Sequence, residues 1–390
     1  MRILYLDTYV TSAPDHHSSS DSIGYGITSS GAIRREFEKR GIAVDILDPL
    51  SLNGGRKVTP SLRRTLWTAS QYPALVHALQ VNPPDLIFAF HSFVVSPALI
   101  RYIQHDLGLH VPIVGYTHGS HWDTTDTYRV ERYPGLEMLD LANLDALDRI
   151  LVVSRYTQRT LDAAIARLHP EVAERLTERV RCVGLPLDTE LMDRCRTTDR
   201  GEAPLIVFNH APIASKNPRL FAEAMSPVLS RTNARLLITR RFPQGGPGTA
   251  ELDALRQRFG NRVVFGCDMD LHDYYRALWS ASIQVSTATH ESLGVATLEA
   301  MYTGTCCLLP RVGSYPEICG DHPDVLYPAG DVDTFIERLL MLVGDADRRN
   351  RIGAELAILA RLYTPEKIVD RIVQVFDEMA GEGKWRAMSC

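Results

Sequence analysis

The chain has 390 residues, enough for two or three domains, and its 45% hydrophobic and 23% charged content is ordinary for a folded globular protein. The formal net charge of −5 gives no electrostatic reason for nucleic acid or an anionic membrane to be a main partner. No apolar run approaches the ~18–20 residues that a membrane span needs, so we expect no transmembrane helix.

Cysteine usage and the first residues bear on the compartment. Seven cysteines, an odd number without a CxxC pair, favour a reducing environment and argue against a structural metal. Residues 2–7 have the pattern of a strand that ends at Asp7, and their apolar run is too short for a signal peptide. We therefore expect a cytoplasmic protein, monomeric or homodimeric, that needs no metal.

Strand and helix patterns alternate through residues 1–193. Such alternation indicates parallel strands joined by crossover helices, hence an α/β, doubly wound domain whose ligands bind beyond the carboxyl ends of the strands. The runs that predict strands are 2–7, 43–47, 85–90, 111–116, 149–154 and 180–185, and those that predict helices are 29–40, 97–107 and 156–168.

The first loop of this domain, residues 8–27, is long and polar. His16, His17 and Asp21 could form a metal cluster, but loops of this length are more often solvated segments or binding loops. Gly24 and Gly26 stand near its end. We expect a solvated loop here.

Histidines follow two of the predicted strands. His118 comes directly after the strand 111–116, with His121 and Asp123 as nearby alternatives, and His91 ends the preceding strand with a weaker claim. A histidine can orient a hydroxyl or bond a sugar near neutral pH. The alternative is that His118 only satisfies the backbone of its loop.

Residues 194–204 form a polar stretch that we interpret as a linker, and a second domain is predicted over 205–363. Its first strand, 205–208, leads into a loop that carries Lys216. A fixed cation there would stabilise a diphosphate leaving group most strongly as the bond to it breaks. The next predicted elements are helix 217–229, strand 235–239, helix 252–259, strand 261–265 and helix 271–280.

Asp268 and Asp270 imitate a metal-binding DxD motif just before the helix 271–280. Acidic residues are favoured at a helix start in any case, because they complement its dipole. We therefore interpret them as part of a helix start.

The region 282–310 combines a strand, a tight loop, a helix and a second strand. We expect Ser292 to cap the helix, whose first free N–H groups, near residues 293–296, would form an anion site beyond the strand end. Glu291 precedes that site, and Glu299 lies on the helix about two turns later at ~3.6 residues per turn. A carboxylate beside an anion site suits a ligand with hydroxyl groups, such as a sugar or a ribose.

These residues resemble the donor site of retaining GT-B glycosyltransferases of family 4. Glu291 and Glu299 stand eight apart around Gly294, with Ala-Met and Gly304 behind them and Pro-Glu-Ile at 316–318, while Leu293 takes the usual aromatic position. The resemblance is strong over 282–320, moderate over 205–281 and architectural over 1–190. It implies two Rossmann-like domains facing across a cleft, with residues 364–390 as a helix that returns to the first domain.

The resemblance also implies roles. Lys216 and the backbone at Gly294 and Val295 would hold the donor diphosphate, Glu299 the ribose and Glu291 the sugar. The family's phosphate-clamping arginine falls on Ala211, a departure for which His210, Arg240 or Arg241 could compensate. The further residues with implied roles are Leu293 beside the donor, Gly266 in the turn that binds the base, and His118, His91, His121, Gly24 and Gly26 on the acceptor side.

We therefore expect a retaining, metal-independent transferase that moves a sugar from a nucleoside-diphosphate sugar, with UDP favoured, to a small soluble acceptor: a sugar, a natural-product aglycone or a nucleobase. One alternative is a catalytically silent sugar-nucleotide-binding protein. Another is a transferase acting on a modified tRNA nucleoside, because the sequence of residues 209–218 is similar to that of an atypical branch of the family. A dehydrogenase is disfavoured, since no strand leads into a GxGxxG loop.

Overall fold

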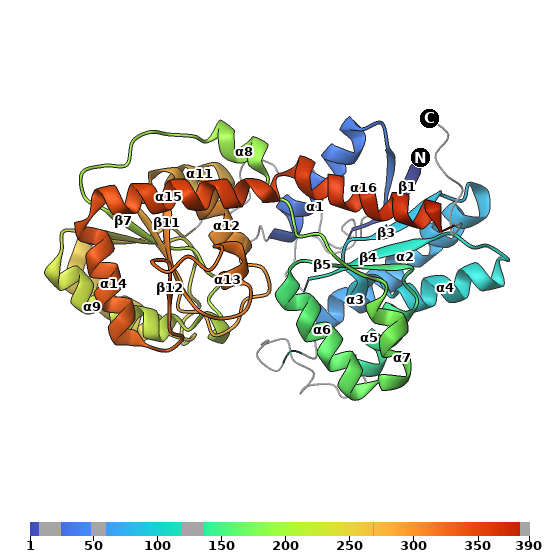
Figure 1. Cartoon of the computed structure of the whole chain (residues 1–390), viewed down its shortest axis with the longest axis horizontal. Helices are drawn as coiled ribbons and strands as arrows, with labels where there is room; N and C mark the ends of the chain where they lie inside the picture. Colours follow the sequence, from blue (N-terminus) through green and yellow to red (C-terminus); the bar gives the residue numbers. More distant parts are fainter. Residues whose placement is uncertain (8–24, 48–59, 119–122, 124–135, 268, 383–390) are drawn as a thin grey trace.

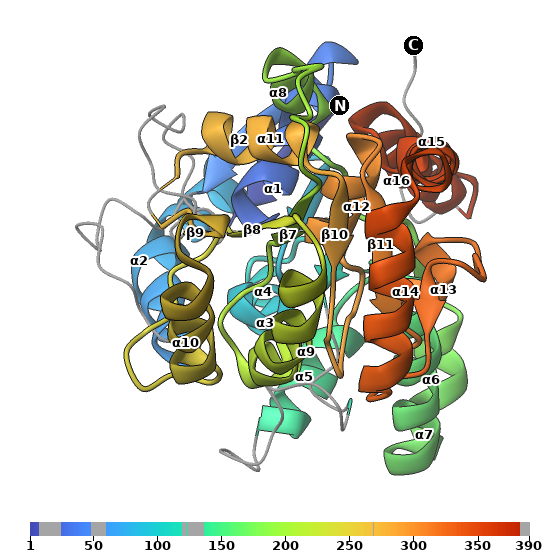
Figure 2. The same cartoon turned by 90° about the vertical axis from the view of Figure 1, so that its left-hand side faces the viewer.

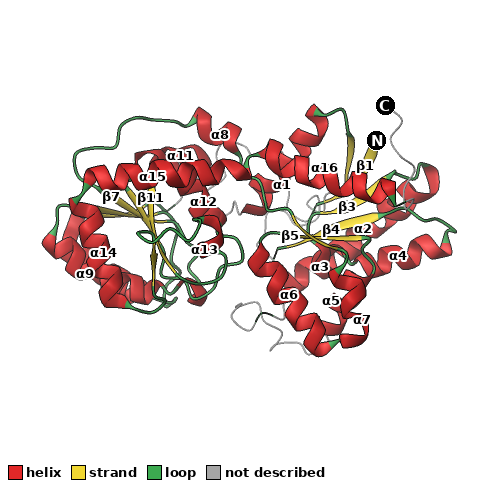
Figure 3. Cartoon of the chain, in the orientation of Figure 1, coloured by secondary structure: helices red, strands yellow, loops and turns green. Residues whose placement is uncertain are grey.

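The computed structural model describes residues 1–7, 25–47, 60–118, 123, 136–267 and 269–382, which fold into the two lobes that lie side by side in Figure 1. Each lobe contains a parallel six-stranded sheet, drawn as yellow strands between red helices in Figure 3. The predicted α/β fold with two doubly wound domains is confirmed. No helix within the described ranges is long and apolar enough to cross a membrane.

The first sheet has the order β2-β1-β3-β4-β5-β6. The strand β1 pairs with β2 on one side and with β3 on the other. The direction of winding therefore reverses between β1 and β3. Ligands bind beyond the strand ends at such a reversal. The strands are β1 Arg2–Leu6, β2 Ala43–Leu47, β3 Leu86–Ala89, β4 Ile113–Thr117, β5 Arg149–Val152 and β6 Val180–Cys182.

The helices that precede β7 in the chain include several that the sequence did not predict. The helix α1 begins four residues earlier than expected and therefore contains Gly26. Ser154 caps α6 by accepting a hydrogen bond from the Thr157 N–H. The helices are α1 Tyr25–Lys39, α2 Pro60–Val81, α3 Ser92–Val95, α4 Pro97–Asp106, α5 Leu136–Asp145, α6 Arg155–Leu168, α7 Pro170–Thr177 and α8 Thr189–Arg194, of which α2, α3, α5, α7 and α8 were not predicted.

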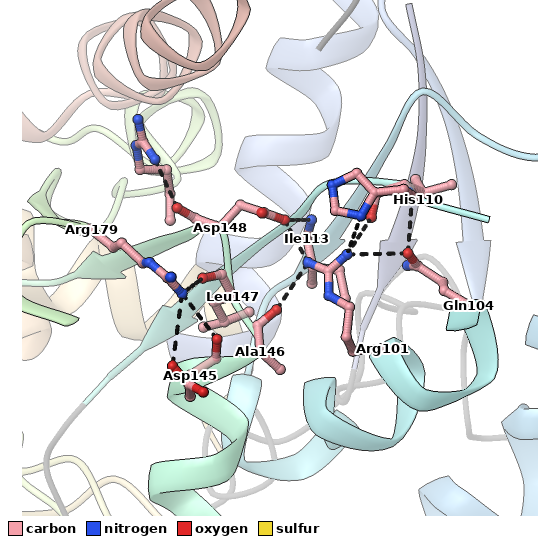
Figure 4. Close-up of polar contacts among 11 residues, drawn as sticks. Arg101, Gln104, His110, Ile113, Asp145, Ala146, Leu147, Asp148 and Arg179 are labelled. Atoms are coloured by element: carbon pink, nitrogen blue, oxygen red, sulfur yellow. Dashed lines mark hydrogen bonds and ion pairs between the residues drawn. The ribbon is translucent and has the colours of Figure 1, made fainter. Parts of the chain in front are cut away.

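A polar network fixes the chain at the edge of the first sheet where β4 and β5 begin (Figure 4). The Arg101 guanidinium donates to the Asp148 carboxylate at 2.6 Å and to the Ala146 carbonyl at 3.1 Å. The same carboxylate accepts the Ile113 N–H at 2.8 Å, and Arg179 donates to two carbonyls of the neighbouring loop. This network lies at the opposite edge from the strand ends at which a ligand would bind, so its role is structural.

The second sheet has the order β12-β11-β10-β7-β8-β9, and most of this order can be followed across Figure 2. Here the winding reverses between β7 and β10, which pair in parallel. The loops that leave these two strands are therefore the ones expected to meet a ligand. The strands are β7 Leu205–Phe208, β8 Arg235–Ile238, β9 Val263–Phe265, β10 Ile283–Val285, β11 Cys306–Pro310 and β12 Leu326–Tyr327.

Helices cover both faces of this sheet, with α11 and α12 on one side in Figure 2 and α9, α10 and α14 on the other. Asp270 caps α11 by accepting the Asp273 N–H, so the predicted helix start is confirmed; Asp268 lies outside the described residues. The helices are α9 Pro218–Arg231, α10 Thr249–Phe259, α11 Leu271–Ser280, α12 Val295–Tyr302, α13 Tyr315–Ile318, α14 Val332–Gly344, α15 Ala346–Ala360 and α16 Pro365–Gly381, with short 3₁₀ turns η3 Ala214–Lys216, η4 Gly260–Arg262 and η5 Arg361–Tyr363.

The last helix, α16, leaves the second lobe and packs on the first (Figure 1). The Phe376 ring lies 6.0 Å from Phe37 of α1 and 6.3 Å from Phe88 of β3. The chain therefore passes twice between the lobes, once between β6 and α8, which packs on α11 of the second lobe, and once through η5 into α16 (Figure 1).

Candidate active site

The loops that follow β7 and β10 lie against each other at the point where the second sheet reverses. The Thr289 N–H donates to the Ser215 carbonyl at 2.8 Å. The Thr287 hydroxyl donates to the carbonyls of Lys216 and Asn217, both at 3.0 Å. These bonds fix η3 beside the loop that leads into α12, so two stretches some 70 residues apart form one site.

A buried ion pair occupies the centre of this site. The Lys216 Nζ donates to Glu291 Oε2 at 2.8 Å and to the His290 carbonyl at 3.1 Å. Each of the two charged side chains is only 13% exposed. Burial alone would raise the pKa of Glu291, but the Lys216 ammonium outweighs it and holds the pKa below its ordinary value. Glu291 is therefore ionised at neutral pH, and the charge of Lys216 is balanced within the protein.

The start of α12 differs from the prediction. Gly294, with φ of 87°, takes the cap position, so the expected cap by Ser292 is wrong. This left-handed backbone strains any residue with a Cβ. A Cβ at Gly294 would also stand 3.2 Å from the ends of both Ile318 and Tyr315. Leu293 is buried beneath the turn, and the helix begins at Val295, one or two residues beyond the expected start.

Glu299 lies deeper than the ion pair, on the buried face of α12. Its carboxylate accepts the hydroxyls of Tyr274 at 2.7 Å and Tyr275 at 3.1 Å, both from α11. Burial raises the pKa of Glu299, although the two tyrosines and Arg240 offset part of the effect. The tyrosine pair was not among the predicted site residues. Its only signal in the sequence was that two adjacent tyrosines occur in the predicted helix 271–280.

Asn209 connects these two parts of the site. Its side-chain amide donates to the Tyr274 hydroxyl at 3.1 Å and to the Ala296 carbonyl at 2.8 Å, in the first turn of α12. The Arg240 guanidinium lies 5.6 Å from the centre of the Tyr274 ring. The sequence placed Arg240 among three candidates for the missing phosphate-clamping arginine, and the structure puts its charge near Glu299.

The other two candidates differ from Arg240 in environment. His210 is buried, and the Gln284 amide nitrogen lies 3.1 Å from its Nε2, so that Nε2 accepts the hydrogen bond. Burial and the nearby Lys216 lower the pKa of His210 to about 3. His210 is consequently neutral at physiological pH and supplies no positive charge. Arg241 is exposed beyond the end of β8, and Gly266 lies in the turn after β9, where its N–H donates to the Ile238 carbonyl.

Two of the candidate histidines, His91 and His118, lie together at the ends of β3 and β4 in the first lobe. The His118 ring is buried, stacks on Tyr116 at 5.5 Å, and lies 5.0 Å from the ring of His91. Its Nε2–H donates to the Phe90 carbonyl. Burial lowers the pKa of His118 to about 4, so its ring is neutral near pH 7. Gly24 and His121 lie outside the described residues, as do His16, His17 and Asp21.

The first lobe touches both residues that flank Glu291. Asp123 lies 3.5 Å from His290 Nδ1, and its carboxylate accepts the Tyr156 hydroxyl at 2.7 Å. The Ser292 carbonyl accepts hydrogen bonds from the hydroxyls of Ser154 at 2.5 Å and Thr157 at 3.2 Å. Sequence reasoning did not find these contacts between the lobes.

Glu317 makes a further contact between the lobes. Its carboxylate accepts the N–H groups of Arg155 and Tyr156 at 3.1 and 3.2 Å, and thereby caps α6 of the first lobe from the second. Within the described ranges, no group of three or more His, Cys, Asp and Glu side chains is arranged to hold a metal ion. The candidate site consists of Lys216, two glutamates, two tyrosines and the start of α12.

Two family models match the chain, one on each lobe. The model of glycosyltransferase family 4 matches residues 29–170, and that of glycosyl transferases group 1 matches residues 203–345. A tRNA-queuosine alpha-mannosyltransferase from Drosophila melanogaster is 27% identical over 286 residues, which are 68% of this chain and 75% of the fly protein.

Solved structures are similar over nearly the whole chain. Sucrose-phosphate synthase from Thermosynechococcus elongatus has a TM-score of 0.73 at 15% identity and covers 98% of this chain and 99% of its own. Anabaena HepE in complex with UDP and glucose has a TM-score of 0.63 at 15% identity, with 97% and 100% covered. At 15% identity this similarity concerns the fold alone. This fold, with two facing Rossmann-like domains, is the one predicted from the sequence.

Proposed function

Because the chain is a glycosyltransferase of the GT-B fold that resembles family 4, we propose that it moves a sugar from a nucleoside-diphosphate sugar to a small soluble acceptor, with retention and without a metal ion. The observation that carries this proposal is the buried Lys216–Glu291 pair at the start of α12. A lysine and a helix start together can neutralise a diphosphate. The silent binding protein considered above has no support from these matches.

In this proposal the ion pair opens when the donor binds. The Lys216 ammonium turns from the Glu291 carboxylate to the diphosphate, and the free N–H groups at the start of α12 bind the same anion. Glu291 is then free to accept a hydrogen bond from a hydroxyl of the sugar. The charge on the departing diphosphate grows in the transition state, so Lys216 acts most strongly at that point.

Glu299 would bind the ribose, with its carboxylate held in place by Tyr274 and Tyr275. His118 would lie on the acceptor side as a neutral ring, which can bond a hydroxyl without adding charge. We favour UDP as the nucleotide, since HepE, which shares the fold, was crystallised with UDP and glucose. We also propose a cytoplasmic location, on the argument that Cys306 and Cys307 are free thiols.

A second candidate acceptor is a modified nucleoside in tRNA. The observation that favours it is the 27% identity to the tRNA-queuosine mannosyltransferase. The net charge of −5 argues against it, because tRNA binding gains most of its affinity from phosphate contacts. The two candidates share the donor site and differ only in the acceptor.

The test begins with thermal unfolding in EDTA with UDP, GDP, ADP or CDP. A ligand at 100 times its dissociation constant adds about 2.7 kcal/mol of stability, enough to measure. The nucleotide that stabilises the protein identifies the donor series, whose sugars are then incubated with small acceptors and, separately, with total tRNA. Release of the nucleoside diphosphate only with tRNA would replace the first candidate by the second, and no stabilisation by any nucleotide, with or without magnesium, would overturn both.

A further inference from the structure

A cavity that is open to solvent lies on the second lobe, away from the ion pair, and Arg196 and Arg361 in its lining are exposed. Its volume is about 690 Å³, within the range of small-molecule sites. It is lined by residues of the segment after α8, by Trp279 of α11, by the carboxyl ends of α12 and α15, and by Arg361 of the turn η5. Its lining shares no residue with the candidate active site.

Three guanidinium groups line this cavity: those of Arg196, Arg200 and Arg361. Across the described residues, none of the three has a carboxylate within ion-pair distance, whereas Arg35, Arg101 and Arg181 of the first lobe each have one. The carboxylate of the lining, Asp193, accepts the Tyr302 hydroxyl at 3.0 Å.

Two of the three arginines are held by uncharged groups. Arg196 lies 5.1 Å from the centre of the Trp279 ring. Arg200 donates through Nη2 to the carbonyls of Thr303 at 3.0 Å and Gly304 at 3.2 Å. Such contacts orient a guanidinium in advance and leave its other N–H groups available, which is what bidentate recognition of an anion requires.

The local charge balance favours an anion. Three guanidiniums against one carboxylate leave an excess of two positive charges, and the carboxyl ends of α12 and α15 offset about one of them, at roughly half a charge each. Burial and the neighbouring Arg349 also lower the pKa of Arg200, the direction expected for a guanidinium without a nearby anion. An anion in the cavity would offset this effect. Thr197 and Thr198 add hydroxyl donors to the same wall.

We propose that this cavity binds a small phosphate-bearing molecule through Arg196, Arg200 and Arg361. A phosphate group matches the donors, because it accepts bidentate hydrogen bonds from more than one guanidinium. The cavity volume beyond the phosphate suits a sugar-sized body. Arg361 belongs to the turn η5, where the chain passes from the second lobe into α16, so the ligand would touch one of the connections between the lobes.

The test compares thermal unfolding in inorganic phosphate and in glucose 6-phosphate with unfolding in chloride of equal ionic strength. Four proteins are measured: wild type, Arg200→Gln/Arg361→Gln, Lys216→Met, and Arg258→Gln as a control. Arg258 is an exposed arginine away from the cavity that donates to Ser226 and Ser230 and lies over the Phe259 ring. Lys216→Met removes the lysine at the other site where phosphate could bind. If the double variant is itself destabilised in chloride, Arg361→Gln alone, at an exposed side chain, replaces it.

We expect wild type, Lys216→Met and Arg258→Gln to be stabilised by phosphate, with about tenfold weaker binding in the arginine double variant. Stabilisation lost in Lys216→Met but kept in the double variant would place the phosphate in the active site and overturn the proposal. Equal stabilisation of all four proteins, or none of wild type, would also overturn it.

Discussion

Replacing Lys216 by methionine tests the buried ion pair most directly. Methionine retains most of the side chain's length and apolar contacts but leaves the Glu291 carboxylate without the cation that lies 2.8 Å from it. Removing one partner of a buried pair costs about 3–5 kcal/mol, because the remaining charge stays desolvated. Both side chains are 13% exposed, so we expect the lower end of this range, about 3 kcal/mol.

The assay is urea unfolding of four proteins at pH 7: wild type, Lys216→Met, Glu291→Gln and the double variant. The double variant contains no buried charge at the pair, so it should regain most of the stability lost in Lys216→Met, with a coupling free energy of at least about 2 kcal/mol. Turnover should not return in the double variant, since the cation that stabilises the leaving group is absent. Stability and catalysis are thereby separated.

The pH dependence of the free energy of unfolding tests the same ion pair independently. In wild type the pKa of folded Glu291 is lowered, so its stabilising contribution is present above the unfolded pKa of about 4.3 and is lost as the pH falls through the folded value. In Lys216→Met the largest influence that lowers the pKa of this carboxyl is gone, and burial, which raises the pKa, becomes the dominant one, so the variant should gain stability relative to wild type between pH 7 and pH 5. A loss below about 1 kcal/mol, with no such gain in acid, would refute the buried pair.

Three further outcomes are expected. Glu299→Gln should weaken nucleotide binding by about tenfold in calorimetry, since the ribose loses a charged acceptor; equal affinity would remove Glu299 from the donor site. Asp123→Asn should lower turnover by about tenfold while the affinity for UDP changes less than threefold, because the residue acts through His290; a parallel loss of both would indicate misfolding. Gly294→Ala should destabilise the protein by about 1–2 kcal/mol in urea unfolding because of its left-handed backbone, and no loss would contradict that conformation.

The sequence patterns predicted all strands of the first sheet and five of the second, because most of these parallel strands are buried on two faces and form short apolar runs. The two-residue strand β12 was not predicted. The long helix α2 was missed since Pro73 interrupts its pattern and its apolar residues do not follow one stripe. The start of α12 was misplaced because Ser292 satisfies the usual cap preference. Its carbonyl instead accepts hydrogen bonds from the other lobe, and the left-handed Gly294 begins the helix.

The centre of the candidate site could be predicted because its residues follow strand ends within one domain. The partners of those residues could not. Tyr274 and Tyr275 reach Glu299 from a helix whose register is set by packing. Nothing in the sequence relates Lys216 to Glu291 as an ion pair, since 75 residues separate them and the relation depends on two loops crossing at one edge of a sheet.

The contacts on either side of Glu291 suggest how the two lobes share the reaction. Asp123 lies against the side chain of His290, whose carbonyl accepts the Lys216 ammonium, and Ser154 binds the carbonyl of Ser292. The glutamate proposed to contact the sugar thus lies in a loop that the first lobe contacts on both sides. If the lobes separated, both flanks would be released together, and a position error of about 1 Å at a reacting group can cost a hundredfold in rate. Donor geometry and acceptor binding would then depend on the same set of contacts between the lobes.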